Sequence, residues 1–253
     1  MKLRLLVLLA LGLLAACGGK ELDLVTAEED AQQLYERARG HLDGARFEQA
    51  IRYFKLLETR YPFSPYALQA QLDLAYAYLL YGQTEKAIAE AERFIRFNPT
   101  HPQVAYAYYL KGVAAFGRRR AFEGWFPRNP ADYDKKPLEE AFATFKQLVE
   151  RHPNSPYAAD AYRRMVYLAN LLARHELEVA RFYAGHGAWI AAANRITYLL
   201  EHFPRSPSAR EALPLLVEAY RALGAEDAAA DAERLLRLNA PRRATAVKDG
   251  SRK

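Results

Sequence analysis

The sequence predicts an all-α protein, a superhelix of five helix pairs. Composition is the first reason: 46 Ala stand against 21 Val, Ile and Thr together. Ala is the best helix former, whereas β-branched residues favour strands. The second reason is that prolines recur in a periodic pattern. A hydrophobic content of 51% excludes a disordered chain. A β-sandwich, a barrel and a parallel α/β sheet are all disfavoured.

The N-terminus reads as an export signal. Lys2 and Arg4 precede an apolar run over residues 5–16, which is too short to span a bilayer, since that takes about 20 residues. The only cysteine, Cys17, follows Ala16 directly, and this arrangement resembles the bacterial lipobox. We therefore expect residues 1–16 to be a lipoprotein signal peptide and 17–26 a lipidated tether attached through Cys17. An ordinary signal peptide with an incidental cysteine is the alternative. The absence of Asp after Cys17 resembles the sorting signal for the outer membrane.

A four-residue motif that begins and ends with proline divides the rest of the chain. The first proline cannot continue the preceding helix, and the second suits the first position of the next. The third residue is Ser64, Ser155 or Ser206 in three of the motifs, and we expect these serines to be N-caps. The motifs are Pro62–Pro65, Pro99–Pro102, Pro153–Pro156 and Pro204–Pro207, and Pro241 closes the series.

Each unit carries a small residue twelve positions before its closing proline and a bulky apolar residue five positions before it. Glycines mark the turns within several pairs. Five such units in register over residues 27–240 resemble the tetratricopeptide repeat, a stacked helix–turn–helix. The small residues are Ala50, Ala87, Ala141, Ala192 and Ala229; the bulky ones are Leu57, Phe94, Leu148, Leu199 and Leu236; the turn glycines are Gly44, Gly82, Gly187 and Gly224.

The first helix is expected to begin at a capping box of Thr26 and Glu29. Residues 117–136 form an insertion, and 241–253 a basic, disordered tail. The stretch 157–184 lacks Gly and Pro, so its helix either projects beyond the stack or bends. The expected first helices of the pairs are 27–43, 66–81, 102–116, 157–184 and 207–222; the second are 46–61, 84–97, 137–151, 188–202 and 226–238.

Motifs for catalysis and metal binding are missing from the sequence. His175-Glu176 begins an H-E-x-x-H pattern, but Val179 stands where the second zinc ligand is required. We expect no catalytic residue, no metal site and no cofactor apart from the lipid on Cys17. The basic run 118–120 lies near aromatic residues, but export to the periplasm argues against nucleic acid as a partner.

Several runs are similar to the BamD family, the lipoprotein subunit of the β-barrel assembly machinery. They are Arg60–Tyr66, Gln71–Leu74, Phe94–Pro102, Pro153–Ser155, Gly187–Trp189 and Asn194–Arg195. The resemblance covers nearly the whole chain. It implies a non-catalytic protein on the periplasmic face of the outer membrane. It also implies contact with a BamA-like POTRA and barrel subunit, with other assembly lipoproteins and with unfolded outer-membrane proteins.

Two sites are expected from the resemblance together with the residues. Arg195, after Trp189 in the C-terminal half, is expected to bind the BamA-like partner through a carboxylate. Tyr61, Phe63 and Tyr66 are expected to bind aromatic substrate signal peptides. A repeat lipoprotein with a cell-wall or competence role is the alternative function. An envelope enzyme is a third, for which the sequence offers no catalytic acid.

Overall fold

The computed structural model describes residues 29–120 and 135–239, and within these ranges it contains ten helices and no strand. The prediction of an all-α fold of five helix pairs is confirmed. Each expected helix agrees with the observed one to within four residues at either end. The pairs are α2 (Ala31–Asp43) with α3 (Phe47–Arg60), α4 (Ala67–Leu80) with α5 (Thr84–Phe97), α6 (Val104–Arg120) with α7 (Lys136–Arg151), α8 (Ala158–Gly185) with α9 (Trp189–His202), and α10 (Pro207–Ala222) with α11 (Glu226–Leu238).

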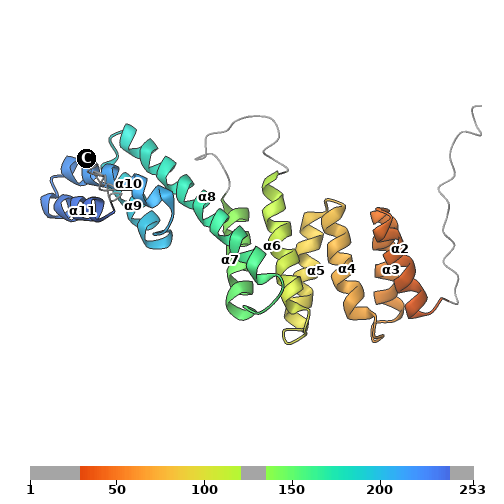
Figure 1. Ribbon diagram of the computed structural model, residues 1–253. Coiled ribbons are helices and arrows are strands. Elements are labelled where there is room, and N and C mark those ends of the chain that lie inside the picture. Colours follow the sequence, from red (N-terminus) through yellow and green to blue (C-terminus); the bar gives the residue numbers. More distant parts are fainter. Residues whose placement is uncertain (1–28, 121–134, 240–253) are drawn as a thin grey trace, which may run out of the picture.

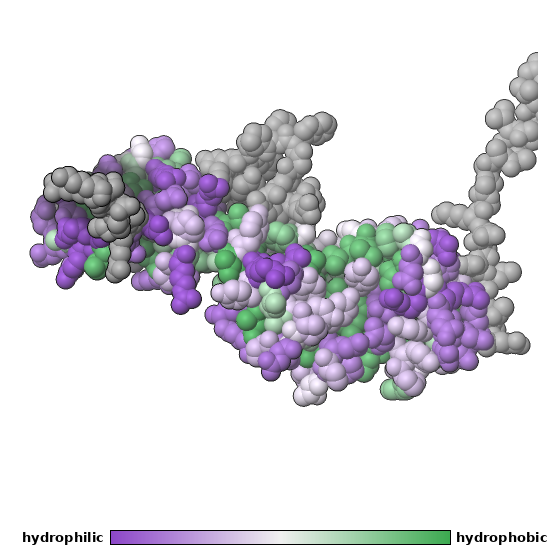
Figure 2. Space-filling model, viewed as in Figure 1, coloured by the Kyte–Doolittle hydropathy of each residue, from purple (hydrophilic) through white to green (hydrophobic). Residues whose placement is uncertain are grey.

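Each helix packs on its neighbour in sequence. The first helices of successive pairs are also in contact; for example, α4 contacts α6, and α8 contacts α10. In Figure 1 the first three pairs stand side by side, and α8 runs obliquely to the last two helices. Figure 2 shows apolar surface on this face concentrated toward the middle of the stack and more polar surface toward both ends.

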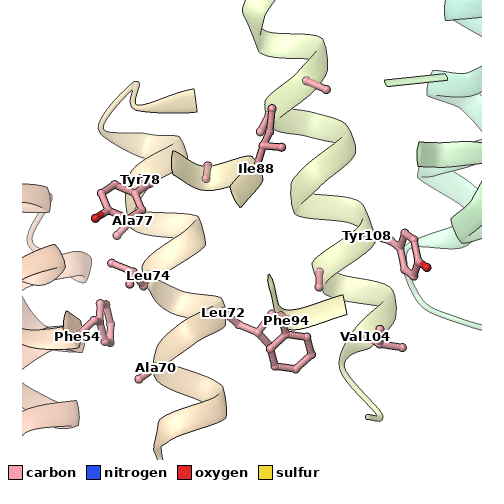
Figure 3. Packing of buried hydrophobic residues seen from close by; sticks show 14 of the residues in the cluster. Phe54, Ala70, Leu72, Leu74, Ala77, Tyr78, Ile88, Phe94, Val104 and Tyr108 are labelled. Atoms are coloured by element: carbon pink, nitrogen blue, oxygen red, sulfur yellow. The ribbon is translucent and has the colours of Figure 1, made fainter. Parts of the chain in front are cut away.

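The small and bulky positions of the repeat form the core, as predicted. All five alanines are buried, and the bulky residues of the first four pairs are fully buried. Leu236 is half-exposed, because within the described residues no further helix pair covers α11. Figure 3 shows how one helix serves two neighbours: α4 directs Leu74 toward Phe54 on one side and Leu72 toward Phe94 on the other.

The start of the first helix differs from the prediction. Asp30 caps α2: its carboxylate accepts from the Gln33 backbone N–H at 2.9 Å, and the Gln33 side chain accepts from the Asp30 N–H at 3.0 Å. Glu29 is instead buried and paired with Arg37, so it cannot complete a box with Thr26, which lies outside the described residues. The box is therefore four residues later than expected.

Only one of the three serines is an N-cap. The Ser206 hydroxyl accepts from the Ala209 N–H at 3.1 Å, and Pro207 begins α10. At Ser64 and Ser155 a backbone turn intervenes, in which the serine carbonyl accepts from the N–H three residues on. The helices α4 and α8 then begin after a tyrosine, and both serine hydroxyls are buried without a protein partner.

The turns within the first, second, fourth and fifth pairs, which the structure describes, use a left-handed residue, and three of the four glycines supply it. Gly82, Gly187 and Gly224 have φ between 69° and 77°. Gly44 does not, with φ −81°; Ala45 takes the left-handed position with φ 55°. The turn of the first pair is displaced by one residue relative to the glycine, so a residue with a Cβ occupies a conformation that favours glycine.

The long helix α8 joins two cores. Its first half, through Leu168 and Leu172, packs in the core of the first three pairs, and its second half, through Leu177 and Ala180, packs in the core of the last two. It is one continuous helix of 28 residues, and because its second half packs with α9 and α10 it does not project beyond the stack, as one of the two expectations held. In the same region α6 continues to Arg120, so the insertion expected at 117–136 begins inside a helix.

Three expectations lie outside the described residues: the signal peptide with its tether, most of the insertion, and the basic tail. Among the helices of the described residues, none is long and apolar enough to cross a membrane.

Candidate functional site

A tyrosine and an aspartate join the first helix pair to the second. The Tyr35 hydroxyl on α2 donates to Asp73 Oδ2 on α4 at 2.8 Å. Asp73 also accepts from Gln69 at 3.1 Å and lies 3.5 Å from Arg39. The Tyr35 ring packs on Tyr66 with 5.4 Å between centroids. This cluster fixes the angle between two repeats at the N-terminal end.

The same combination recurs between the third pair and the fourth. The Tyr109 hydroxyl on α6 donates to Asp160 Oδ2 on α8 at 2.8 Å, and the Tyr109 ring stacks on Tyr157 at 5.2 Å. Arg164 Nε donates to the same carboxylate at 2.5 Å, and Arg163 at 3.1 Å. Tyr66 and Tyr157 each follow the second proline of their motif, so the repeat register itself places both ring pairs.

The two carboxyl groups differ in their pKa. Burial raises the pKa of Asp73 above its ordinary value, against the hydrogen bond from Tyr35 and the charge of Arg39. The Arg164 guanidinium, which donates to Asp160, lowers the pKa of that carboxyl to about 2, with a further contribution from the Tyr109 hydroxyl. Burial and the hydrogen bond to Asp73 raise the pKa of Tyr35. These are structural contacts between repeats, and they hold no free acid or base.

The structure separates the three aromatic residues of the expected peptide site. The Tyr61 hydroxyl donates to the Glu29 carbonyl at 2.8 Å, and Tyr66 packs against Tyr35, so both rings are half-buried in repeat contacts. Phe63, at the tip of the loop between them, is 99% exposed. Of the three residues, only Phe63 therefore has a ring that is exposed to solvent, whereas the rings of Tyr61 and Tyr66 contribute to packing between repeats.

One of the two expected partner residues, Arg195, lies beside a buried carboxylate. Arg195 Nη1 on α9 lies 3.1 Å from Glu176 Oε2 on α8, and Lys135 Nζ at the start of α7 lies 3.0 Å from Glu176 Oε1. Glu176 is 2% exposed, whereas the Arg195 side chain is 42% exposed. Trp189, six residues before Arg195, is half-buried against the C-terminal core. Arg195 thus has an internal carboxylate partner, which the sequence analysis did not foresee.

Sequence reasoning missed Asp73, Asp160 and Glu176 as members of these contacts. One signal was available for Asp73, which is an acidic residue within a largely apolar helix, where a charge requires partners. Glu176 lies among Arg174, His175 and Glu178, so its neighbours in the sequence gave no such signal. In the described residues no group of three His, Asp or Glu side chains could hold a metal ion. Cys17 lies outside those residues.

Comparison with known proteins covers nearly the whole chain. The YfiO family, described as "Outer membrane lipoprotein", matches residues 27–235. A protein of Vibrio cholerae named "Outer membrane protein assembly factor BamD" is 41% identical over 92% of this chain and 96% of its own length. A protein of the same name from Neisseria meningitidis serogroup A is 38% identical over 94% of this chain and 92% of its own.

Among solved structures, a crystal structure of MamA protein has a TM-score of 0.41 at 18% identity, covering 81% of this chain and 88% of that one. A thermophilic TPR protein of Thermus thermophilus has a TM-score of 0.40 at 18% identity, covering 85% and 93%. The sequence relatives carry the assignment, because their identity exceeds a third along almost all of both chains. The chain belongs to the BamD family of outer-membrane protein assembly factors, which are non-catalytic outer-membrane lipoproteins.

Proposed function

We propose that this protein is the lipid-anchored scaffold of an outer-membrane β-barrel assembly complex, on the periplasmic face. One observation carries the proposal: two relatives named outer membrane protein assembly factor BamD match this protein over more than nine-tenths of both chains. A scaffold needs several binding faces and no catalytic group, and a stack of helix pairs provides them. Purification from detergent-solubilised membranes tests this proposal. Co-purification of a protein with POTRA domains and a barrel is the expected result, and its absence would contradict the proposal.

The anchor of this scaffold is a lipid on Cys17. It is the only cysteine, at the end of a signal-type apolar run. A single acyl chain binds membranes marginally, so stable attachment requires two or more. Mass spectrometry of the mature N-terminal peptide checks this. An unmodified Cys17, or cleavage at another bond, would contradict the anchor.

The C-terminal half docks on the BamA-like subunit around Trp189 and Arg195. Arg195 keeps guanidinium donors beyond the one that faces Glu176, and two-fifths of its side chain is exposed to a partner. The neighbouring Ile190 is 64% exposed and adds apolar area. A partner carboxylate would therefore meet Arg195 beside an apolar side chain, which is a common composition for a binding site.

Substitution at this position separates docking from folding. Arg195→Glu reverses the charge but sets a carboxylate beside buried Glu176, so Arg195→Gln is the second variant. Arg205→Glu, on an exposed loop residue nearby in sequence, is the matched control. We expect both Arg195 variants to weaken co-purification of the partner, and Arg205→Glu to leave it unchanged. Full retention with Arg195→Gln at an unchanged melting temperature would contradict this site.

Unfolded outer-membrane proteins and their terminal signal peptides are the proposed substrates of the N-terminal repeats. The exposed Phe63 ring offers an apolar contact, while Tyr61 and Tyr66 hold its loop in place. A photo-crosslinker at Phe63 should capture a substrate C-terminal peptide, and excess free peptide should compete. Phe182, also an exposed ring but in the C-terminal half, is the control position. Crosslinks at Phe182 alone would place substrate binding elsewhere.

A further inference from the structure

The loops between successive helix pairs lie along one edge of the N-terminal half. In Figure 1 the loops that join α3 to α4, α5 to α6 and α7 to α8 all lie at the lower edge of the first three pairs. We call this the loop edge and define it by residues 61–66, 98–103 and 152–157, together with the helix ends beside them. The turns within pairs lie at the opposite ends of the helices.

Two aromatic rings are exposed on the loop edge beyond what the core requires. Phe63 is 99% exposed and Phe97, at the end of α5, is 70% exposed. The Arg96 guanidinium carbon lies 5.3 Å from the centroid of the Phe97 ring, which pairs a cation with an aromatic face. Neither ring contributes to the buried core, so their apolar area is available to a partner.

The loop edge is also basic. The second helices of the first three pairs each carry an arginine in the last turn, Arg60, Arg96 and Arg151, and a glutamate in the first turn. The helix dipole favours a negative side chain at the start of a helix and a positive one at its end. The consequence is collective, because residues 59–72, 93–103 and 151–159 contain no Asp or Glu. The last turns of α3 and α7 also carry Glu58 and Glu150, and Glu58 pairs with Arg93. The loops themselves are free of acidic residues, so the edge presents the three arginines beside exposed aromatic rings.

The chain enters the fold beside this edge. The Tyr61 hydroxyl binds the Glu29 carbonyl at 2.8 Å, so the first described residue lies against the first loop. Eleven residues lie between Cys17 and Glu29, and the twelve steps of chain that join them reach at most about 40 Å. An anchor at Cys17 therefore keeps the Phe63 loop within that distance of the membrane.

We propose that the loop edge lies on the phospholipid surface of the anchoring membrane, with Phe63 and Phe97 at the interface and the arginines facing anionic headgroups. Phenylalanine rings at a membrane surface bury their apolar area at the boundary of headgroups and acyl chains, and basic side chains are attracted to anionic lipid. A lipid anchor at one end of the chain leaves the orientation of the protein free, and a second contact with the membrane restricts it. The proposal rests on the anchor at Cys17 and goes beyond it by assigning the face that meets lipid.

The absence of a second cysteine allows a sharp test. In the lipidated full chain Cys17 carries no free thiol, so a cysteine introduced elsewhere takes a fluorophore alone. Thr100→Cys places the label on the loop edge, and Thr84→Cys places it at the other end of α5. The two sites are separated by a 14-residue helix, about 20 Å long. The labelled proteins are reconstituted in vesicles of phosphatidylethanolamine and phosphatidylglycerol that carry a headgroup-level nitroxide quencher.

We expect strong quenching at position 100 and little at 84. Replacing both rings, with Phe63→Ser and Phe97→Ser, should lower vesicle binding of the unlipidated chain about tenfold, as the loss of apolar burial predicts. Equal quenching at the two sites, or quenching at 100 that survives the double substitution and high salt, would overturn the proposal.

The anchor and the substrate site are distinguished in the same experiment. Failure of the wild-type protein to float with vesicles would contradict the anchor, and a chain tethered by a histidine tag at residue 18 on chelating vesicles then still tests the edge. Excess substrate peptide can also be added to protein labelled at position 63 or at position 100. Relief of quenching at 63 alone would show that the peptide and the lipid surface compete for the Phe63 loop, while the rest of the loop edge stays on the membrane. Quenching at neither site in the tethered chain would overturn the edge proposal alone.

Discussion

The interface between α2 and α4 and the interface between α6 and α8 use the same tyrosine–aspartate hydrogen bond in different surroundings. Both bonds are 2.8 Å long, and both tyrosines pack on the tyrosine that precedes the next helix. The Asp73 side chain is 6% exposed, however, and that of Asp160 is 34% exposed. Burial raises the pKa of Asp73, while Arg164 lowers that of Asp160.

The difference shows that one contact geometry can have two energetic roles. At the first interface the hydrogen bonds compensate the desolvation free energy of a buried carboxylate, so the loss of one donor should destabilise the folded state by part of that free energy. At the second interface arginines and water share the carboxylate, so each donor matters less. The N-terminal repeats should therefore be sensitive to single polar changes, and the central repeats to changes of packing.

Packing at the third pair gives the largest expected effect. A Cβ added to Gly112 on α6 would lie 2.6 Å from the ring of Phe145, which is fully buried on α7. Gly112→Ala should therefore lower the free energy of unfolding by about 2 kcal/mol, since overpacking exceeds the gain in helix propensity. Gly40→Ala on α2, where the added Cβ meets no atom within 4 Å, is the control. Urea denaturation compares the two, and equal stability would contradict this packing.

The loss of one hydroxyl should separate the two interfaces. Tyr35→Phe removes a donor from buried Asp73 and should cost about 2 kcal/mol, as for hydrogen bonds to charged groups. Tyr109→Phe leaves Asp160 with two arginines and solvent, so the expected cost is about 0.5 kcal/mol. Chemical denaturation of both variants measures the difference. A similar loss of unfolding free energy in both variants would mean that burial of the aspartate does not determine how much its hydrogen bond to tyrosine stabilises the protein.

The sequence predicted the helices better than it predicted what joins them. Apolar periodicity and proline spacing are local, so helix ends and the buried alanines followed directly. The caps at Ser64 and Ser155 were wrong, because serine followed by proline also fits a turn in which a tyrosine precedes the helix. The internal pairing of Arg195 depends on Glu176, 19 residues away on a helix whose exposed face the sequence did not reveal.

The turns extend the comparison to the backbone. Ala45 and Gly82 hold the same place in the first and second pairs: each N–H donates to the carbonyl three residues back, at 3.0 and 3.1 Å. Both have positive φ, which suits glycine and strains alanine. Ala45→Gly should therefore raise stability by about 1 kcal/mol, and Gly82→Ala should lower it by a similar amount. Thermal melts check the pair, and a change of the same sign in both would contradict the assignment.

The smallest expected effect, and the one most specific to the comparison, is a pH dependence of opposite sign. An aspartyl carboxyl in the unfolded chain has a pKa of about 3.9. The pKa of Asp73 is raised above this on folding, so the stability that this group contributes is present at low pH and is lost as pH rises through its folded pKa. The pKa of Asp160 is about 2, so its contribution is present above the unfolded pKa and is lost as pH falls toward 2.

Asparagine variants make the two trends visible, because the amide keeps an acceptor without titrating. The advantage of wild type over Asp73→Asn should shrink as pH rises from about 3 to 6, and that over Asp160→Asn should grow over the same range. For Asp160 the change should be only a few tenths of a kcal/mol, because a third of the side chain is exposed to solvent that screens the charges. Urea midpoints at matched ionic strength measure both slopes. Parallel slopes would show that Arg39 compensates Asp73 as fully as Arg164 compensates Asp160, and the distinction between the two interfaces would then fail.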